Sequence, residues 1–401
     1  FDRALVAGAG AVLMIILGAL SQEDAFAAID WNTIGLLGGM MIIVLVAKRS
    51  GIFEYLAVAT VKIAKAKPVL ILLLLSVITG LLSAVLDSVT TILLILPVTL
   101  SVTRDLKINP VPFIISEIFV SNIGGTATMV GNPPNIILGS AAGLNFMDFL
   151  QNAAPIALPM LLGVSLLLGL IYRKQMRADP EARAKVLAID AKCCIKDKKL
   201  LIKSLVVLGA VIAGLALHSV IHLESATIAL AGAAVLLILR GKQPQKILHE
   251  IEWKTILFFA GLFIMVGALQ ATGVINLLAQ ATVSLTHGDP ALTVIAILWI
   301  SALASAFIDN IPFVATMIPL VKSMGALTGM ALGPVWWALA LGACLGGNGT
   351  IIGASANVVA IGMAEEHGIK ISFKKYFKVA FPLMLLTVAV CTVYVWFMYL
   401  R

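Results

Sequence analysis

The chain has 401 residues, of which 61% are hydrophobic and only 12% are charged, and its mean hydropathy is +1.07. Soluble globular domains carry about a quarter charged residues, so this composition excludes an ordinary soluble domain. The net charge of +8 lies in short loops, where it bears on membrane topology rather than on nucleic-acid binding. Four cysteines in a chain of this length do not form a disulfide framework.

The first 177 residues alternate apolar stretches with glycine, proline and charged interruptions. Apolar segments of about 20 residues are long enough to cross a bilayer as helices. Because the chain starts at Phe1 rather than methionine, we expect residues before it. In chain order, the expected elements are spans at 5–20 and 31–47, an amphipathic segment at 51–67, a hairpin of two short apolar arms at 68–102, a broken helix at 111–142 and a closing span at 150–172.

A basic loop follows. Residues 173–203 contain ten Lys and Arg residues against four acids, so the positive-inside rule predicts that this loop is cytoplasmic. The loop at 21–30 carries only acids and should face the other side, as should the C-terminal end. We expect a multi-pass protein of the cell's inner (plasma) membrane, with 178–199 as the linker between its halves. A cytoplasmic ATPase subunit, if the protein has one, would dock on the 173–203 loop.

The remaining residues, 200–401, follow the same plan. In chain order, the expected elements are spans at 200–218, 225–239 and 256–269, an amphipathic segment at 273–289, a hairpin at 290–325, a broken helix at 333–364 and a closing span at 377–399.

An internal repeat explains this resemblance between the halves. The stretch IDWNTIGLLGG begins at Ile29, and the similar IEWKTILFFAG begins 222 residues later at Ile251. The same offset aligns many other positions without a gap. These pairs include Ser83 with Ser305, Asp87 with Asp309, Pro97 with Pro319, Thr128 with Thr350, Gly131 with Gly353 and Asn135 with Asn357.

Flanking charges give the two halves opposite orientations. Lysine and arginine bracket the hairpin at 68–102, so it should open to the cytoplasm, whereas the hairpin at 290–325 should open outward. Inverted repeats are typical of secondary transporters, whose substrate site lies at the repeat interface near the membrane midplane. The sequence therefore predicts an all-α polytopic membrane protein with two inverted-topology repeats, each with long helices, a re-entrant hairpin and a broken helix.

Polar residues gather at the hairpin tips and at the helix breaks. Asp87 and Asp309 are the acids of the two tips, and an acid inside the membrane is a functional candidate by default. The plain alternative is that each aspartate caps the arm that follows it. The breaks, GGTATMVGNPPN at 124–135 and GGNGTIIGASAN at 346–357, expose backbone groups that line a cavity or lie inside protein. The predicted binding residues are Asp87, Ser88, Asn122, Gly124, Gly125, Thr126, Thr128, Asn132, Asn135, Asp309, Asn310, Gly347, Asn348, Thr350, Ser355 and Asn357, with Asp87 and Asp309 as proton carriers.

The four stretches contain no Arg or Lys, which favours a small neutral or cationic solute over a multiply charged anion. Cys344 is a weak candidate ligand for As(III), because thiolates favour soft metalloids, although a buried cysteine is more often a small hydrophobe. Glu117 enters the first broken helix, where a proton-path role is an open alternative. We expect no resident metal or other cofactor, and H⁺, or alternatively Na⁺, as the coupling ion.

The motifs SNIGGTATMVGNPPNIILG, SAFIDNIPF and GACLGGNGTIIGASANVVAIG resemble the ArsB/NhaD permease family of the ion transporter superfamily. The resemblance covers essentially the whole chain. It implies a scaffold domain and a transport domain, the latter built from the hairpins and broken helices and moving like an elevator. The tips begin with Asp87 and Asp309 where the superfamily's sodium-coupled dicarboxylate carriers have Ser-Asn-Thr. In this respect the chain is similar to arsenite and antimonite efflux permeases and to the melanosomal pink-eyed dilution transporters.

These observations favour efflux of trivalent arsenite and antimonite in exchange for protons. The first alternative is Na⁺/H⁺ antiport by the same acids. A passive channel and an intramembrane aspartyl protease using both aspartates are further alternatives, and the repeat argues against the protease because it explains both acids without catalysis. We expect no enzymatic activity. The expected partners are the lipid bilayer, the small inorganic solute and, by analogy with the superfamily, a second copy of the chain.

Overall fold

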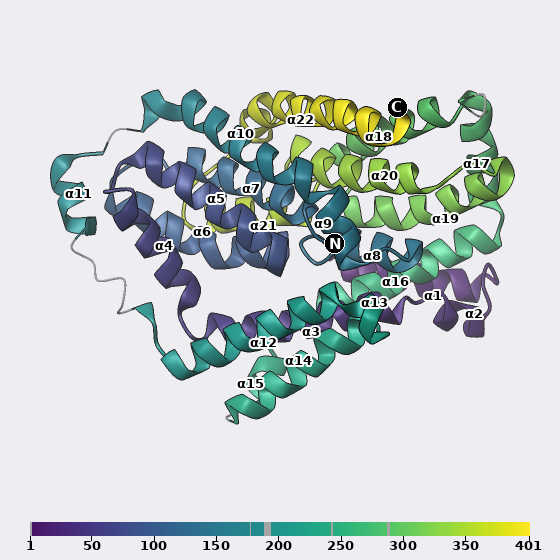
Figure 1. Ribbon diagram of the computed structural model, residues 1–401, viewed down its shortest axis with the longest axis horizontal. Coiled ribbons are helices and arrows are strands. Elements are labelled where there is room, and N and C mark those ends of the chain that lie inside the picture. Colours follow the sequence, from purple (N-terminus) through teal and green to yellow (C-terminus); the bar gives the residue numbers. More distant parts are fainter. Residues whose placement is uncertain (1, 177, 188–193, 242–243, 287–288) are drawn as a thin grey trace.

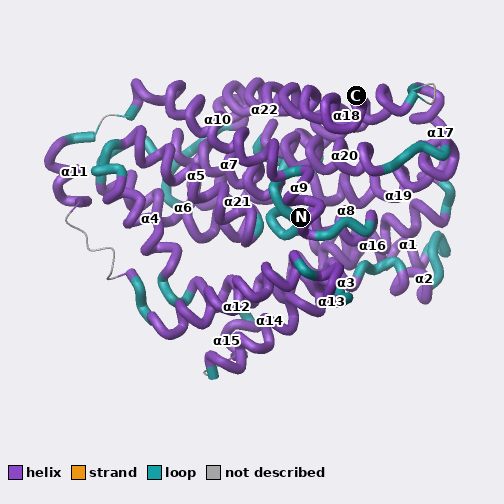
Figure 2. Tube along the Cα trace, in the orientation of Figure 1, coloured by secondary structure: helices purple, strands orange, loops and turns teal. Residues whose placement is uncertain are grey.

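All the regular secondary structure in the described part of the chain is helical. Helices and loops account for the backbone there, with no strand (Figure 2). Nine helices in that part are long and apolar enough to cross a membrane, which confirms the prediction of an all-α polytopic membrane protein. The computed structural model describes residues 2–176, 178–187, 194–241, 244–286 and 289–401, so part of the predicted basic loop, at 177 and 188–193, lies outside the described residues.

The helices form two layers (Figure 1). In one layer, α3 (Trp31–Lys48) packs along α14 (Ser225–Arg240), and α1 (Arg3–Ile16) packs along α16 (Trp253–Ala271). We refer to this layer as the scaffold layer. It also contains α2 (Gln22–Ala27), α12 (Lys198–Ala216), α13 (His218–Ile221) and α15 (Pro244–Leu248).

The other layer contains both hairpins and both broken helices, and we refer to it as the hairpin layer. Here α5 (Pro68–Leu86) packs on α7 (Val111–Thr126), and α18 (Pro290–Phe307) packs on α20 (Gly333–Gly346). Its other members are α6 (Ser88–Asp105), α8 (Pro133–Ala142), α9 (Phe146–Asn152), α10 (Ala154–Tyr172), α19 (Asn310–Thr328), η3 (Gly347–Gly349), α21 (Ser355–Glu366) and α22 (Phe373–Val395). The remaining elements are α4 (Ile52–Ile63), η1 (Arg173–Gln175), α11 (Pro180–Leu187), α17 (Val274–Leu285) and η4 (Trp396–Leu400).

The hairpins differ from the prediction in the length of their arms. Pro68 and Pro290 begin the first arms, where proline loses no helical hydrogen bond. The second arms were expected to be short, but they continue to Asp105 and Thr328, beyond the predicted ends at 102 and 325. Each second arm contains a proline that it accommodates within the helix, so every arm spans 18 or 19 residues.

Other boundaries also shift. The expected span at 5–20 ends at Ile16, because the chain turns at Gly18 with a φ of +73°. The broken helices are interrupted over a shorter stretch than predicted, since α7 continues to Thr126, α8 begins at Pro133 and α21 begins at Ser355. The second broken helix also ends at Glu366, beyond the predicted end at 364.

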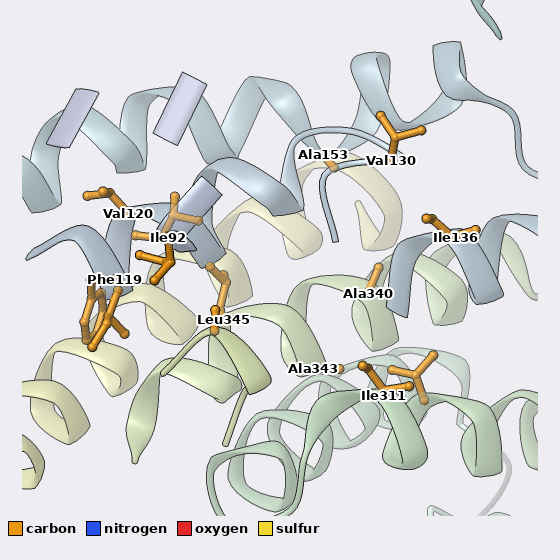
Figure 3. Packing of buried hydrophobic residues seen from close by; sticks show 14 of the residues in the cluster. Ile92, Phe119, Val120, Val130, Ile136, Ala153, Ile311, Ala340, Ala343 and Leu345 are labelled. Atoms are coloured by element: carbon orange, nitrogen blue, oxygen red, sulfur yellow. The ribbon is translucent and has the colours of Figure 1, made fainter. Parts of the chain in front are cut away.

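A continuous apolar core holds the hairpin layer together. Figure 3 shows part of it, with buried side chains from α6, α7, α8, α19 and α20, among them Ile92, Phe119, Ile136 and Leu345. In α7 every residue from Val111 to Thr126 is buried. The helix ends that form the breaks therefore lie inside protein.

The scaffold layer depends on close helix contact, which provides the first prediction. A Cβ added at Gly39 of α3 would lie 2.7 Å from the backbone carbon of Ala229 in α14, whereas one at Gly38 would meet nothing within 4 Å. We expect Gly39→Ala to destabilise the protein by about 1–3 kcal/mol through overpacking. Gly38→Ala is the matched control and should be neutral or slightly stabilising, because alanine favours helix. Thermal unfolding in detergent measures both, and equal midpoints for the two variants would contradict the packing argument.

Candidate substrate site between the two broken helices

Each broken helix is interrupted at equivalent positions of the repeat. The first is non-helical between Thr126 and Pro133, and the second passes through a short 3₁₀ turn and resumes at Ser355. Backbone groups freed by such a break are costly in an apolar medium unless other groups pair with them.

Two asparagines satisfy the freed carbonyls. The Nδ2 of Asn135 donates to the carbonyl oxygens of Gly125 at 3.2 Å and Thr128 at 2.9 Å. The Nδ2 of Asn357 donates to the carbonyls of Gly347 at 2.7 Å and Thr350 at 2.8 Å. These contacts are related by the 222-residue offset, so each half of the chain closes its break in the same way.

The hairpins are tied to the broken helices by a second set of matched bonds. The hydroxyl of Ser83 donates to the carbonyl of Ser121 at 2.6 Å, and the hydroxyl of Ser305 donates to the carbonyl of Ala343 at 2.7 Å. Thr128 and Thr350 likewise donate to hairpin carbonyls, those of Ala84 and Ala306. Each hairpin is therefore joined to its broken helix by buried hydrogen bonds.

The two halves meet in a cluster of buried amides. Asn122 Nδ2 donates to Asn348 Oδ1 at 2.8 Å and to Asn357 Oδ1 at 3.0 Å. The repeat partner of Asn122 is Cys344, whose thiol contacts Asn135 Oδ1 at 3.3 Å. Asn122 of the first half thus donates to Asn357, which closes the second break, and Cys344 of the second half donates to Asn135, which closes the first break. We call this group, Asn122, Asn135, Cys344, Asn348 and Asn357, the amide centre.

Three polar atoms at and around the amide centre have no hydrogen-bond partner among the residues that the structure describes. They are the Oδ1 of Asn122 and the Nδ2 atoms of Asn132 and Asn310, and all three side chains are buried. The thiol of Cys344 is also in contact with the side chains of Thr126 and Asn132. Buried polar groups are nearly always hydrogen-bonded, so the unpaired atoms of Asn122 and Asn310, with the amide of Asn132 that lies against the Cys344 thiol, mark this group as the candidate place for a bound molecule or an ordered water.

Both hairpin-tip aspartates cap the arms that follow them, as the plain alternative predicted. Asp87 accepts from the backbone N of Thr90 at 2.9 Å and from its hydroxyl at 2.6 Å, and its own φ is +93°. Asp309 accepts from the backbone N of Ile311 at 3.0 Å. Capping uses one carboxylate oxygen in the second tip and leaves the other for contacts outside the hairpin.

The tip at Asp309 makes a contact that the sequence did not predict. Its Oδ2 accepts from the hydroxyl of Ser355 at 2.7 Å and pairs with Nη1 of Arg3 at 3.3 Å. Arg3 also donates to Ser355 and lies over the ring of Phe258, with 5.1 Å to the centroid. Arg3 belongs to α1 of the scaffold layer, so this ion pair joins the two layers.

The tip at Asp87 is separate from the amide centre. Among the described residues its hydrogen bonds go to its own arm. A cavity of about 260 Å³ is lined by Thr90 of that arm with Lys48, Leu94, Glu250, Glu252 and other residues of α3 and α6. Ser88 is buried at the start of α6.

Some of the predicted glycines serve packing. A Cβ at Gly124 would lie 2.0 Å from the carbonyl oxygen of Gly80, and one at Gly125 would lie 2.3 Å from that of Gly131. Gly124 therefore lets the first hairpin approach α7, and Gly125 lets the break fold back on itself. Over the described residues, no cluster of three or more His, Cys, Asp or Glu residues is arranged to hold a metal ion.

Comparison with known proteins identifies the family. A family model described as "Citrate transporter", CitMHS, matches residues 1–342. The chain belongs to the CitMHS family. An "uncharacterized transporter" of Mycobacterium tuberculosis is 46% identical over 97% of this chain and 92% of its own length. The P protein of Mus musculus is 36% identical, over 95% of this chain and 56% of its own length.

The fold also matches a solved structure. The YdaH transporter of Alcanivorax borkumensis, described as having an unusual topology, superposes with a TM-score of 0.61 at 17% identity and covers 97% of this chain and 88% of its own. The family match and the similar transporter of Mycobacterium tuberculosis identify the CitMHS protein as a secondary transporter of the ion transporter superfamily rather than an enzyme, and its nine candidate spans in the described residues make it multi-pass. The narrower resemblance to arsenite permeases stays a prediction.

The break-closing amides provide the second prediction. Asn357→Asp keeps the acceptor for Asn122 but removes both donors to the Gly347 and Thr350 carbonyls. Each buried carbonyl left unpaired costs about 1–3 kcal/mol, so the variant should unfold at a lower temperature. The matched control is Asn276→Asp on exposed α17, where the side chain only accepts, from Ser323. Hydrogen exchange at 350–354 should quicken in the first variant alone, and unchanged exchange there would contradict the assignment.

Proposed function

We propose that this CitMHS protein exports a small uncharged polyhydroxyl solute, with trivalent arsenite and antimonite as the first candidates, in exchange for protons. The observation that carries the proposal is the amide centre with its three unpaired polar atoms. Trivalent arsenic at neutral pH is an uncharged trihydroxide. Its hydroxyls donate and accept, which suits one free acceptor, on Asn122, and two free donors, on Asn132 and Asn310.

The composition of the centre supports an uncharged solute. Its groups are amides and a thiol, and the free Nδ2 donors of Asn132 and Asn310 are unsuited to a bare cation. The buried Cys344 thiol adds the one soft ligand that As(III) prefers. This arrangement argues against sodium as the solute that binds in the amide centre. Sodium bound at the hairpin tips is still the alternative to protons as the coupling ion.

The moving part is proposed to be the hairpin layer. Its hairpins are bonded to its broken helices through Ser83, Ser305, Thr128 and Thr350, so the site can travel as one body past the scaffold layer. The ion pair of Arg3 with Asp309 crosses the boundary between the layers. Such movement separates this pair, and a carboxylate left without its cation in the membrane is stabilised by taking up a proton.

Uptake of As(III) into inverted membrane vesicles under an imposed pH gradient tests the proposal and is the third prediction. The wild type should accumulate As(III), and Asp309→Asn and Asp87→Asn should lose gradient-driven accumulation. Asp105→Asn, at the exposed end of α6, is the control and should behave as wild type. Absence of accumulation in the wild type overturns the arsenite proposal. Accumulation driven by a sodium gradient instead would identify sodium as the coupling ion.

A carboxylate solute such as citrate is the second candidate, favoured by Arg3. This guanidinium lies at Ser355, the first residue of α21, and carboxylates bind arginine through charge-assisted hydrogen bonds. The family description also refers to citrate. Asp309 already pairs with Arg3, which is why we rank this candidate second.

The fourth prediction separates the two solutes through Arg3. If citrate is carried, Arg3→Gln should raise its KM about tenfold, the equivalent of one lost charge-assisted contact. If As(III) is carried, the same variant should leave the KM for As(III) within about twofold, because the amide centre does not contain Arg3. Arg3→Lys keeps the charge and is the control for both solutes. Initial rates in vesicles over a range of solute concentrations measure these values.

A further inference from the structure

A buried glutamate in α7 has no role in the mechanism described so far. Glu117 is 1% exposed, and the hydroxyl of Thr99 in α6 donates to its Oε1 at 2.5 Å. Its Oε2 is buried without a partner. A carboxylate inside a membrane protein is costly unless it is paired or protonated, so this residue needs an explanation.

The fold does not require the glutamate. The 222-residue offset that relates the halves aligns Glu117 with Leu339 and Thr99 with Val321. In the second half, α20 and α19 therefore pack an aliphatic pair at the same place, and both of those residues are buried. The first half replaces an apolar contact with a carboxyl and a hydroxyl, at a cost in desolvation and with no gain in packing.

Among the described residues, no charged group pairs with Glu117. Of the helices packed against α7, neither α5, α10 nor α20 contains a charged residue. The charged residues of α6, α21 and α22 are exposed near helix ends. They are Arg104, Asp105, Glu365, Glu366, Lys374, Lys375 and Lys378. The buried titratable groups on these helices are Tyr172, Cys344, Tyr376 and Cys391, of which Tyr376 donates to the Asn348 carbonyl and Cys344 contacts Asn135.

A cavity comes close to Thr99 from one side. Its volume is about 330 Å³, and its lining includes Pro97, Leu100 and Thr103 of α6 together with His367. Thr103 donates to the carbonyl of Thr99 at 2.9 Å, so the cavity lies within one helical turn of the residue that holds Glu117. The sequence predicts this end of α6 to be cytoplasmic.

Glu117 is also linked to the amide centre. Two residues further along α7, the carbonyl of Phe119 accepts from Asn348 Nδ2 at 3.3 Å. Glu117 therefore lies on the helix that carries Asn122 and contacts Asn348.

We propose that Glu117 is a proton-binding site of the hairpin layer, distinct from Asp87 and Asp309. Its unpaired Oε2 takes up one proton from water in the cavity beside Thr103 to form a neutral carboxylic acid. The reverse step returns the proton to that water. The inference rests on one part of the proposed function, namely that transport is coupled to protons. It does not depend on which solute the amide centre binds. Glu117 then supplies a coupling proton in addition to those of the hairpin tips, and this proton travels with the site.

Infrared difference spectra of the purified full chain in lipid, recorded between acidic and alkaline buffer, test this directly. The wild type should have a protonated-carboxyl band that disappears as the pH rises. Because every titrating carboxyl contributes to this band, Glu117→Gln should lose only the component of the buried carboxyl, and Glu366→Gln, at the exposed end of α21, should keep that component. If the band is the same in Glu117→Gln, or if it depends on sodium rather than on pH, the proposal is wrong.

A double variant provides the transport test and the fifth prediction. Glu117→Leu with Thr99→Val copies the pair that the second half already has at Leu339 and Val321, so it should fold with a thermal midpoint at or above that of the wild type. Solute exchange without a pH gradient should continue. Accumulation driven by the pH gradient should fall about tenfold, as expected for loss of a coupling free energy of ordinary size.

The outcomes separate this inference from the proposed function. Full gradient-driven accumulation in the folded double variant overturns the role of Glu117. A wild type that accumulates no As(III) but retains the infrared band overturns the arsenite proposal and leaves Glu117 as a proton site. Thr99→Val alone removes the hydroxyl that stabilises the carboxylate, so its infrared transition should move to higher pH than in the wild type. An unchanged transition would show that Thr99 does not hold the carboxylate.

Discussion

The structure depends on one constraint: the backbone freed at two helix breaks must find hydrogen-bond partners within the protein. Asn135 and Asn357 meet this constraint from inside the helices that follow the breaks, each donating to carbonyls at the beginning of its own break and within it. The Nδ2 of each asparagine is used in closing the break, but its Oδ1 stays free to accept a hydrogen bond. Each of these oxygens accepts from a residue of the other half. The contacts of Asn122 and Cys344 with those oxygens join the two halves at the amide centre.

The hydrogen bonds that hold the fold together are the same in both halves of the chain, whereas several polar residues of the site differ between the halves. The bonds that close the breaks and tie the hairpins recur at the same offset in both halves, which is the behaviour expected of features required for folding. Several polar groups of the site break the symmetry, among them Asn122 against Cys344, Asn132 against Ala354, Asn310 against Ser88 and Glu117 against Leu339, together with an ion pair with Arg3 at one tip. Since folding does not need these differences, they are where the chemistry of transport is best sought.

The architecture could be predicted from the sequence because the residues that mark hairpins and helix breaks lie close together along the chain. Glycine, proline and asparagine at the breaks, and one acid in each hairpin tip, predicted hairpins and broken helices to within a few residues. The second arms were longer than expected, since Pro97 and Pro319 are accommodated within helices that have tertiary support. Arg3 could not be predicted, because it meets Asp309 across 306 residues of sequence and no local pattern marks such a contact.

An uncharged centre has a consequence for coupling. If the solute site contains only amides, hydroxyls and a thiol, the solute cannot compete with a proton for one carboxylate, as it would in a simple exchange at a shared ligand. The charges lie apart from it, at the tip that Arg3 neutralises and along α7 at Glu117. Coupling must then act through the energies of the two positions of the hairpin layer, because moving a charged carboxylate away from its partner costs more than moving a protonated one. In such a design the solute can change between relatives while the proton-linked machinery stays the same.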